Sequence, residues 1–309
     1  MKQIIKKLPV PIVGLMLALA ASGNLVLSYG EIYRNIFGAL SAIILLLILA
    51  KMIMFPKGVS EALDNPVVAS VFPTLSMGIM LLSTYLKPFA SSIAFGIWII
   101  GLVLHIILII LFTKNYLFNF NIKKVFPSWF IVYVGIVVGS VTGPAFDMAN
   151  IGKILFWFGL VSYFALLPVV LKRIVKIKEI PEPALPTMAI FTAPVALCLA
   201  GYMSSFQEKN MFMVWLLVAL SQASYLFVLL QLPKLLKLKF YPSYSAFTFP
   251  MVISGISIKL TSGFLANSGN PVAILMYIVK FEEFLGVAIV LYVLIRYISF
   301  LLAKPETAK

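Results

Sequence analysis

The chain of 309 residues has one cysteine, Cys198, one histidine, His105, and only two aspartates, Asp64 and Asp147. A single cysteine excludes an intrachain disulfide. The sequence has no His, Cys and carboxylate spacing typical of a metal site, no glycine-rich phosphate loop and no nucleophile–base set. We therefore expect no metal, no cofactor and no enzymatic activity. An intramembrane enzyme is the alternative class, but both aspartates fall at connections rather than paired on helices.

Charged residues are also scarce, at 11%, whereas 62% of the residues are hydrophobic. A soluble fold could not bury so much apolar surface. The apolar runs of membrane-spanning length lie at about 8–28, 36–54, 67–86, 92–113, 126–143, 151–171, 185–203, 211–231, 241–262 and 271–302. The sequence predicts an all-α integral membrane protein with ten transmembrane helices in a single domain over residues 1–309. The first run also resembles a cleaved signal peptide, whose removal would leave nine spans.

The basic residues are distributed unevenly between the two ends of these predicted spans. Most Lys and Arg residues fall on one side, and the other side holds only Arg34, Lys87, Lys153, Lys209 and Lys259. The positive-inside rule therefore places both termini in the cytoplasm of a cell-membrane protein. The net charge of +14 is explained by this topology and by contact with anionic lipid headgroups, so we expect no nucleic-acid partner.

Five of the runs begin near a proline, and these prolines are 54 to 64 residues apart. The leading prolines are Pro9, Pro73, Pro127, Pro186 and Pro242. Such a spacing is the length of one membrane helical hairpin with its connections. We predict five hairpin repeats at about 8–54, 67–113, 126–171, 185–231 and 241–302.

The two helices of each predicted hairpin differ in character. The odd-numbered runs hold small and hydroxyl-bearing residues, whereas the even-numbered runs are uniformly apolar, as in 43–49 and 102–110. Polar groups and proline-freed carbonyls are costly against lipid. The odd helices should therefore lie inside, in a quasi-fivefold arrangement around a central pore. The alternative is that the small residues only permit close helix packing.

The ninth run contains the segment Phe247-Thr248-Phe249-Pro250-Met251. Together with Pro9 and Gly14 of the first run, it resembles the tellurite-resistance and dicarboxylate transporter family, which includes the plant slow-type anion channels. The resemblance implies a pore lined by the odd helices and closed midway by a phenylalanine, in a homotrimer with one pore per subunit. Phe249 matches the gating residue because it directly precedes the proline. Phe247 lies about 200° away around a helix.

The repeat register gives a second argument for this gate. The residues seven positions after each leading proline are Met16, Met80, Val134, Ala193 and Phe249. All are apolar, so a layer formed by them would be a hydrophobic constriction that the Phe249 ring could close. The pairs Pro186/Pro194 and Pro242/Pro250 share an eight-residue spacing, so helices seven and nine should bend alike. The alternative role of Phe249 is ordinary packing.

Few charges fall within the predicted spans. Lys259, near the outer end of the ninth helix, is a candidate charge at the outer mouth, and its alternative role is snorkelling to headgroups. Lys280, Glu282 and Glu283 form a cluster in the last helix. We interpret this cluster as a structural Lys–Glu pair or as charges located in the outer leaflet, with a proton-coupling site as the alternative.

These features predict a passive channel that conducts small monovalent anions such as chloride or nitrate and is gated by Phe249. The alternative function is proton-coupled transport of a small dicarboxylate such as malate, or a tellurite-related export.

The charge asymmetry makes a direct prediction about topology. Reporters fused after Lys176 and after Leu301 should both report the cytoplasm, and a reporter in the 205–210 loop should report the exterior. Opposite locations for the two ends of the mature chain would contradict ten spans and support a cleaved signal.

Overall fold

The computed structural model describes residues 2–303, and these residues form helices and connections without a β-strand. Nine of their helices are long and apolar enough to cross a membrane. The all-α prediction is confirmed. The first predicted span is the shorter apolar helix α2 (Ile12–Leu25), about 21 Å long at 1.5 Å per residue. The count of ten crossings therefore stays a prediction.

We call the helices of the odd-numbered predicted spans the inner helices. The first is the single helix α2, and the other four are interrupted. After α2, they are α5 (Pro66–Val71) with α6 (Thr74–Leu86); α8 (Trp129–Val134), η4 (Gly135–Val137), α9 (Val138–Thr142) and η5 (Gly143–Phe146); η7 (Glu182–Thr192) with α11 (Ala193–Ser205); and η8 (Pro242–Phe247) with α13 (Thr248–Asn267).

The even-numbered spans are continuous helices, which we call the outer helices. They are α3 (Glu31–Met54), α7 (Ser91–Phe112), α10 (Ala149–Lys172), α12 (Met211–Leu235) and α14 (Ala273–Leu302). One π-helical turn extends α7, η2 (Thr113–Leu117), and another extends α10, η6 (Arg173–Ile177). The remaining short helices are α1 (Lys2–Lys7), η1 (Leu27–Tyr29), α4 (Pro56–Leu63) and η3 (Ile122–Lys124).

The prolines account for most of the interruptions in the inner helices. Pro73 separates α5 from α6, and Pro242 begins η8. Pro186 lies inside η7 rather than at its start. Pro194 and Pro250 both sit in the first turn of the α-helix that follows a 3-10 stretch, and proline is tolerated in a first helical turn. The seventh and ninth spans thus change winding at equivalent places, in agreement with their equal proline spacing.

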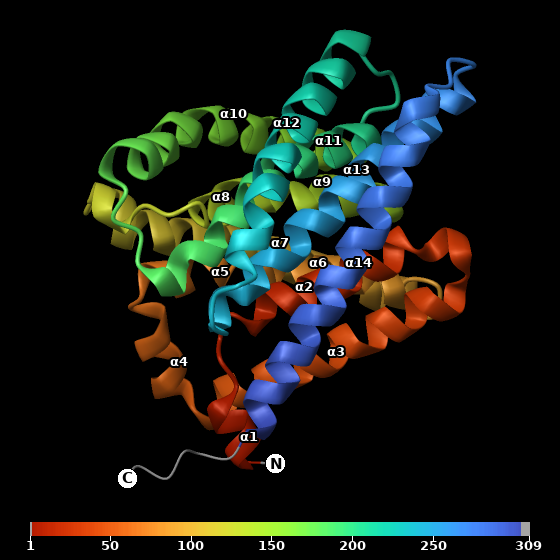
Figure 1. The fold of residues 1–309 in the computed structure, drawn as a ribbon. Coiled ribbons are helices and arrows are strands. Elements are labelled where there is room, and N and C mark those ends of the chain that lie inside the picture. Colours follow the sequence, from red (N-terminus) through yellow and green to blue (C-terminus); the bar gives the residue numbers. More distant parts are fainter. Residues whose placement is uncertain (1, 304–309) are drawn as a thin grey trace.

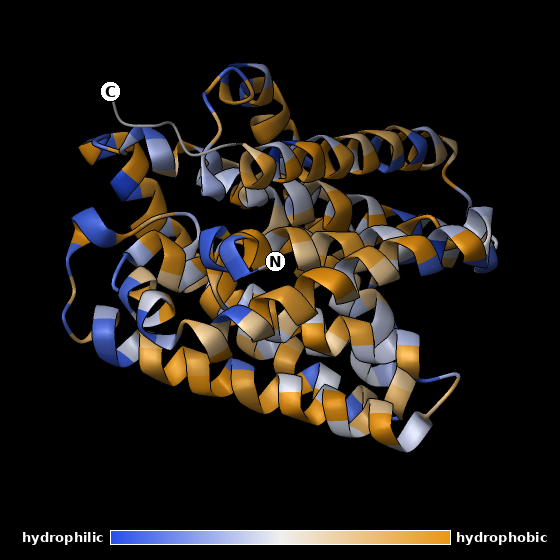
Figure 2. Cartoon of the chain, turned by 90° about the horizontal axis from the view of Figure 1, so that it is seen from below, coloured by the Kyte–Doolittle hydropathy of each residue, from blue (hydrophilic) through white to orange (hydrophobic). Residues whose placement is uncertain are grey.

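Burial separates the inner helices from the outer ones. The four inner spans of membrane length are 61–94% buried over their most apolar windows, compared with 28–33% for the five outer helices. Every residue of α2 except Asn24 is buried. Figure 2 shows hydrophobic residues along the long helices and hydrophilic segments at their ends and connections. The predicted division into inside and outside helices is confirmed by this burial.

The inner helices contact one another in a closed order. α2 packs against α6, α6 against α9, α9 against α11, α11 against α13, and α13 against α2 (Figure 1). Each outer helix contacts its own inner partner and the next inner helix, and α14 closes the circle by packing on α2. A ring of five inner segments is therefore enclosed by five outer helices.

Buried polar contacts join neighbouring repeats across this ring. His105 of α7 is fully buried; its Nε2 donates to the Val132 carbonyl at 3.1 Å, and its Nδ1 accepts from the Ser76 hydroxyl at 2.8 Å. Ser205 Oγ donates to the Ser140 carbonyl, and Ser140 Oγ donates to the Gly152 carbonyl, each at 2.6 Å. The lone histidine is thus a packing residue that links the second and third repeats.

The two described ends of the chain lie on one face of the ring. Helix α1 contacts the C-terminal part of α14 (Figure 1), and Lys7 Nζ donates to the Ala303 carbonyl at 2.7 Å. This face also carries the broken starts of the inner helices, because α1 directly precedes Pro9 and Pro11.

Candidate functional site

Three cavities each have residues from all five inner segments or their N-terminal ends in their walls. The widest, which we call the proline-lined mouth, has a volume of about 410 Å³ and lies on the face that carries α1. All five repeats contribute to its wall, with Pro11, Pro66, Phe126, Pro183 and Pro242 as representatives. The N-terminal ends of the inner helices therefore surround a common opening.

A much smaller cavity of about 30 Å³ lies among residues further along the same helices. We call it the narrow cavity. Its wall is almost entirely apolar and again includes every repeat, through Gly14, Met77, Val134, Ala193 and Phe249. A space of this size holds only one or two water molecules.

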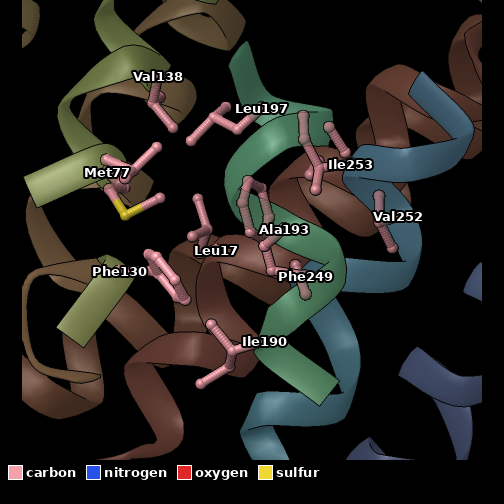
Figure 3. Packing of buried hydrophobic residues seen from close by; sticks show 14 of the residues in the cluster. Leu17, Met77, Phe130, Val138, Ile190, Ala193, Leu197, Phe249, Val252 and Ile253 are labelled. Carbon is pink, nitrogen blue, oxygen red and sulfur yellow. The ribbon is translucent and has the colours of Figure 1, made fainter. Parts of the chain in front are cut away.

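The third cavity, the distal cavity, has a volume of about 220 Å³. Its polar wall residues are Asn24, Thr84 and Thr142. Phe249 and Leu197 line both this cavity and the narrow cavity. Figure 3 shows Phe249 beside Ala193, with Ile190 on one side of this level and Leu197 on the other. The two shared side chains therefore stand between the two cavities.

The predicted apolar layer is assembled only in part. Val134, Ala193 and Phe249 line the narrow cavity together, but Met16 and Met80 line none of the three cavities. The Met16 methyl group lies against Gly78, and the Met80 side chain lies against Gly101 of α7. Gly14 and Met77 occupy the wall positions of the first two repeats instead.

The different winding of the inner helices accounts for part of this shift, since the α-helical α8 still brings Val134 to the wall. The residues before Ala193 and Thr248 form 3-10 helix, with about 3.0 residues per turn, whereas α2 and α6 have about 3.6. Seven residues after a proline therefore end at different angles in different repeats. A fixed spacing of seven residues would mark one face only if all five inner helices had the same winding.

Phe247 is fully buried and packs edge-on against Tyr244, with ring centroids 5.0 Å apart. It lines none of the three cavities. Phe249 retains 6% exposure on the cavity side of α13. The predicted difference between the faces of these two phenylalanines agrees with the structure.

Arg34 of α3 is a cation beside the distal cavity that the sequence did not single out. Its Nε donates to Asn24 Oδ1 at 3.0 Å, its Nη2 donates to the Thr84 carbonyl at 3.3 Å, and its guanidinium lies 4.1 Å from the Tyr85 ring centroid. Asn24 and Thr84 both line the cavity. No periodicity marks Arg34, because only the packing of α3 on α2 and α6 brings it there.

Lys259 does not line any of the three cavities. Its Nζ forms an ion pair with Glu283 and donates to the Leu25 carbonyl and to Ser28 Oγ, both at 2.7 Å. The Tyr29 hydroxyl donates to the other Glu283 oxygen at 2.9 Å, and this hydrogen bond raises the pKa of Tyr29. Lys259 therefore closes a contact between the first and last repeats.

The expected Lys–Glu pair within α14 is not formed: the lysine that pairs with Glu283 is Lys259 of α13, not Lys280. Lys280 is exposed, and among the described residues it forms no ion pair. Glu283 pairs with Lys259 of α13, and the same ammonium group also donates to the Leu25 carbonyl. Glu282 is fully buried, and neither of its oxygens has a hydrogen-bond partner in residues 2–303.

An all-helical bundle whose apolar spans enclose a series of cavities is the architecture of a multi-pass membrane channel or transporter. Comparison with known families gives the particular group. The sequence model of the Voltage-dependent anion channel family matches residues 8–298, so the chain belongs to this family. This match confirms the family resemblance that the sequence suggested.

One curated relative is similar to most of the chain. It is a protein of Methanocaldococcus jannaschii named an uncharacterized transporter, 25% identical over 257 residues. The alignment covers 73% of this chain and 72% of that protein.

The Lys259–Glu283 pair allows a test of the contact between the first and last repeats. Replacement of Lys259 by Met should lower the free energy of unfolding by roughly 2 kcal/mol, because it leaves a carboxylate that is only 7% exposed without its cation. The loss should be smaller than for a fully buried pair, since the Lys259 side chain is 30% exposed.

The double variant Lys259→Met with Glu283→Met should recover part of this loss, and thermal unfolding of the purified protein measures both effects. Lys280→Met is the matched control and should change stability little. A loss for Lys280→Met equal to that for Lys259→Met would contradict the assigned pairing.

Proposed function

We propose that the protein is a passive channel for small monovalent anions such as chloride and nitrate, with Phe249 as its gate. The observation that carries this proposal is the position of Phe249 between the narrow and distal cavities. The proposed path runs along the axis of the inner ring, from the proline-lined mouth to the distal cavity.

The cavity sizes support closure by dehydration. An anion in the mouth or the distal cavity has space for water, with about 410 and 220 Å³ available, whereas the narrow cavity offers about 30 Å³ between apolar side chains. An ion that lost its water there would find few polar replacements, because the only hydroxyls in the wall, those of Thr74 and Ser245, already donate to backbone carbonyls. A hydrophobic constriction of this kind blocks ions until it widens and wets. Phe249 and Leu197 are the side chains whose movement would join the two cavities.

The electrostatic surroundings favour anions over cations. Of the described residues that line the three cavities, none is acidic, and the one carboxylate bonded to a wall residue is Glu182, which accepts from the Tyr241 hydroxyl at the mouth. The five inner helices point their N-terminal ends, which carry partial positive charge, toward the mouth. Arg34 adds a full positive charge next to the distal cavity through Asn24 and Thr84. These weak attractions would draw anions without holding them in the path.

The arrangement in the membrane is part of the proposal. We take the inner ring and the outer helices as five hairpins in a quasi-fivefold pore with ten crossings, α2 being the shortest. The position of both described ends on one face supports an even number of crossings. The charge asymmetry supports an orientation in which that face is on the cytoplasmic side of the cell membrane. A homotrimer with one pore per subunit, in contact with membrane lipid, remains the expected assembly.

The coupled-transport alternative receives less support. A proton-coupled dicarboxylate symporter would use a titratable group close to its substrate, but Glu282 and Glu283 line none of the three cavities. Reconstituted protein separates the two functions, since a channel conducts anions without a proton gradient and a symporter requires one.

Phe249→Ala should increase anion flux. Removal of the ring would join the narrow and distal cavities past small neighbours such as Ala193, so the constriction should wet. We expect chloride or nitrate flux through proteoliposomes to rise at least several-fold above wild type. Leu197→Ala should also raise flux, because Leu197 shares the same boundary.

The control is Phe247→Ala, which removes a ring of equal size from a different face of the same helix. It should lower stability, by about 3 to 5 kcal/mol in soluble-core precedents, without a rise in flux. Equal or lower flux from well-folded Phe249→Ala protein would rule out Phe249 as the gate. It would not rule out a pore gated by another residue.

Arg34→Gln should lower anion flux. Loss of one nearby positive charge is worth about 1 kcal/mol at the dielectric of a partly buried site, which corresponds to roughly fivefold. Arg34→Lys should keep most of the flux. Lys87→Gln is the matched control, because Arg34 donates to Asn24 and Thr84 of the distal cavity wall, whereas the described Lys87 side chain makes no hydrogen bond to a cavity-lining residue. Measurement at low salt gives the largest difference. A flux in Arg34→Gln unchanged from wild type would exclude Arg34 from the path.

A further inference from the structure

Buried polar atoms without partners are concentrated at one place in the described chain. Nine such side-chain atoms occur, and six of them belong to residues on three adjacent helices. These residues, which we call the α12–α14 cluster, are Ser221, Gln222 and Tyr225 of α12, Ser254 of α13 and Glu282 of α14. Since native proteins leave few buried polar atoms unpaired, this concentration marks a candidate binding site.

The cluster includes the Glu282 carboxylate. α13 and α14 approach closely there, because a Cβ added at Gly255, next to Ser254, would lie 3.5 Å from the backbone of Glu282. The Ser254 hydroxyl, the Gln222 amide nitrogen and both Glu282 oxygens have no hydrogen-bond partner in residues 2–303. Glu282, Ser254 and Ser221 are fully buried, and Tyr225 is 4% exposed. The three α12 residues fall within about 100° of the helix circumference.

The cluster is separate from the proposed anion path. Ile253 and Ile256 of α13 line the distal cavity, whereas Ser254 and Glu282 line none of the three cavities. The cluster thus lies behind α13, on the side that faces α12 and α14.

No side chain of the described residues neutralises Glu282. The nearest lysine in sequence, Lys280, is exposed, and Lys259 is already bound to Glu283. The two ion pairs found in residues 2–303 both leave Glu282 out. An unpaired carboxylate is expensive in the membrane interior, so a ligand of this site should be positively charged.

We propose that the α12–α14 cluster binds one small monovalent metal cation, with Na⁺ as the best match. Carboxylate, hydroxyl and amide oxygens are hard ligands that suit such ions. One carboxylate balances one positive charge, and residues 2–303 contain no group of three or more His, Cys, Asp and Glu residues to hold a metal of higher charge. Rotation of the Gln222 amide by 180° would present its oxygen, because amide oxygen and nitrogen positions are interchangeable.

The test uses the purified full-length protein and the metal ions alone. Its midpoint of thermal unfolding should rise saturably with NaCl, rise less with KCl and not respond to choline chloride at equal ionic strength and pH 8. Any ligand that binds only the folded state raises this midpoint. The measurement does not depend on transport, so its outcome is independent of the proposed channel.

Variants assign the effect to the cluster. Glu282→Gln should lose the Na⁺-dependent shift, whereas the adjacent Glu283→Gln should keep it, although it is less stable. Ser254→Ala keeps the carboxylate and should weaken the apparent Na⁺ affinity by roughly tenfold. If Glu282→Gln does not fold, the Ser254→Ala variant still decides the question, because its unfolding midpoint should need a higher Na⁺ concentration to rise.

Three results would overturn the proposal. The first is an equal unfolding midpoint of the wild type in Na⁺ and in choline. The second is a full Na⁺ shift in Glu282→Gln or an unchanged Na⁺ affinity in Ser254→Ala. The third is a midpoint that follows pH identically in Na⁺ and in choline, which would mean that Glu282 is neutralised by a proton only.

Discussion

The structure depends on one constraint, which is that backbone groups without a helical partner must be kept away from lipid. The inner helices break this rule locally at their prolines, and 3-10 turns replace regular winding before Ala193 and Thr248. Such segments are tolerated because an outer helix covers each junction between two inner helices. The same breaks shape the proline-lined mouth, so the feature that endangers stability in a membrane also forms the opening of the proposed path.

Closure of the ring follows from the contact between the first and last repeats. α2 is only 14 residues long, yet it is buried along nearly its whole length between α3, α6, α13 and α14. Lys259 joins the end of α2 to α14 through the Leu25 carbonyl and Glu283. A charge that a simple reading assigns to the mouth of a pore is therefore used to hold the ring together. Arg34, from an outer helix, takes the position beside the distal cavity instead.

α13 joins the two proposed sites in one helix. Its cavity face carries Phe249 and Ile253, and its opposite face carries Ser254 next to Glu282. α13 and α14 approach closely at Gly255 and Gly286, since an added Cβ at either would lie about 3.5 Å from backbone atoms of the other helix, in ordinary van der Waals contact. Anions and a cation would thus be handled on opposite sides of a single helix, which keeps a full negative charge out of the proposed anion path.

The sequence by itself determined the class of the protein. The scarcity of charge and the apolar runs require membrane helices, and the prolines and hydroxyls of the odd runs require them to lie inside, because lipid cannot satisfy a polar group. Val134, Ala193 and Phe249 were also predicted from the spacing, and they do line the narrow cavity. Only the tertiary structure decided the other wall residues, because Met16 packs against Gly78 and Met80 against Gly101, away from the narrow cavity. It also decided the partner of Glu283, the isolation of Glu282 and the place of Arg34, since each depends on which helices meet across the ring, and a spacing along one chain holds no information about such contacts.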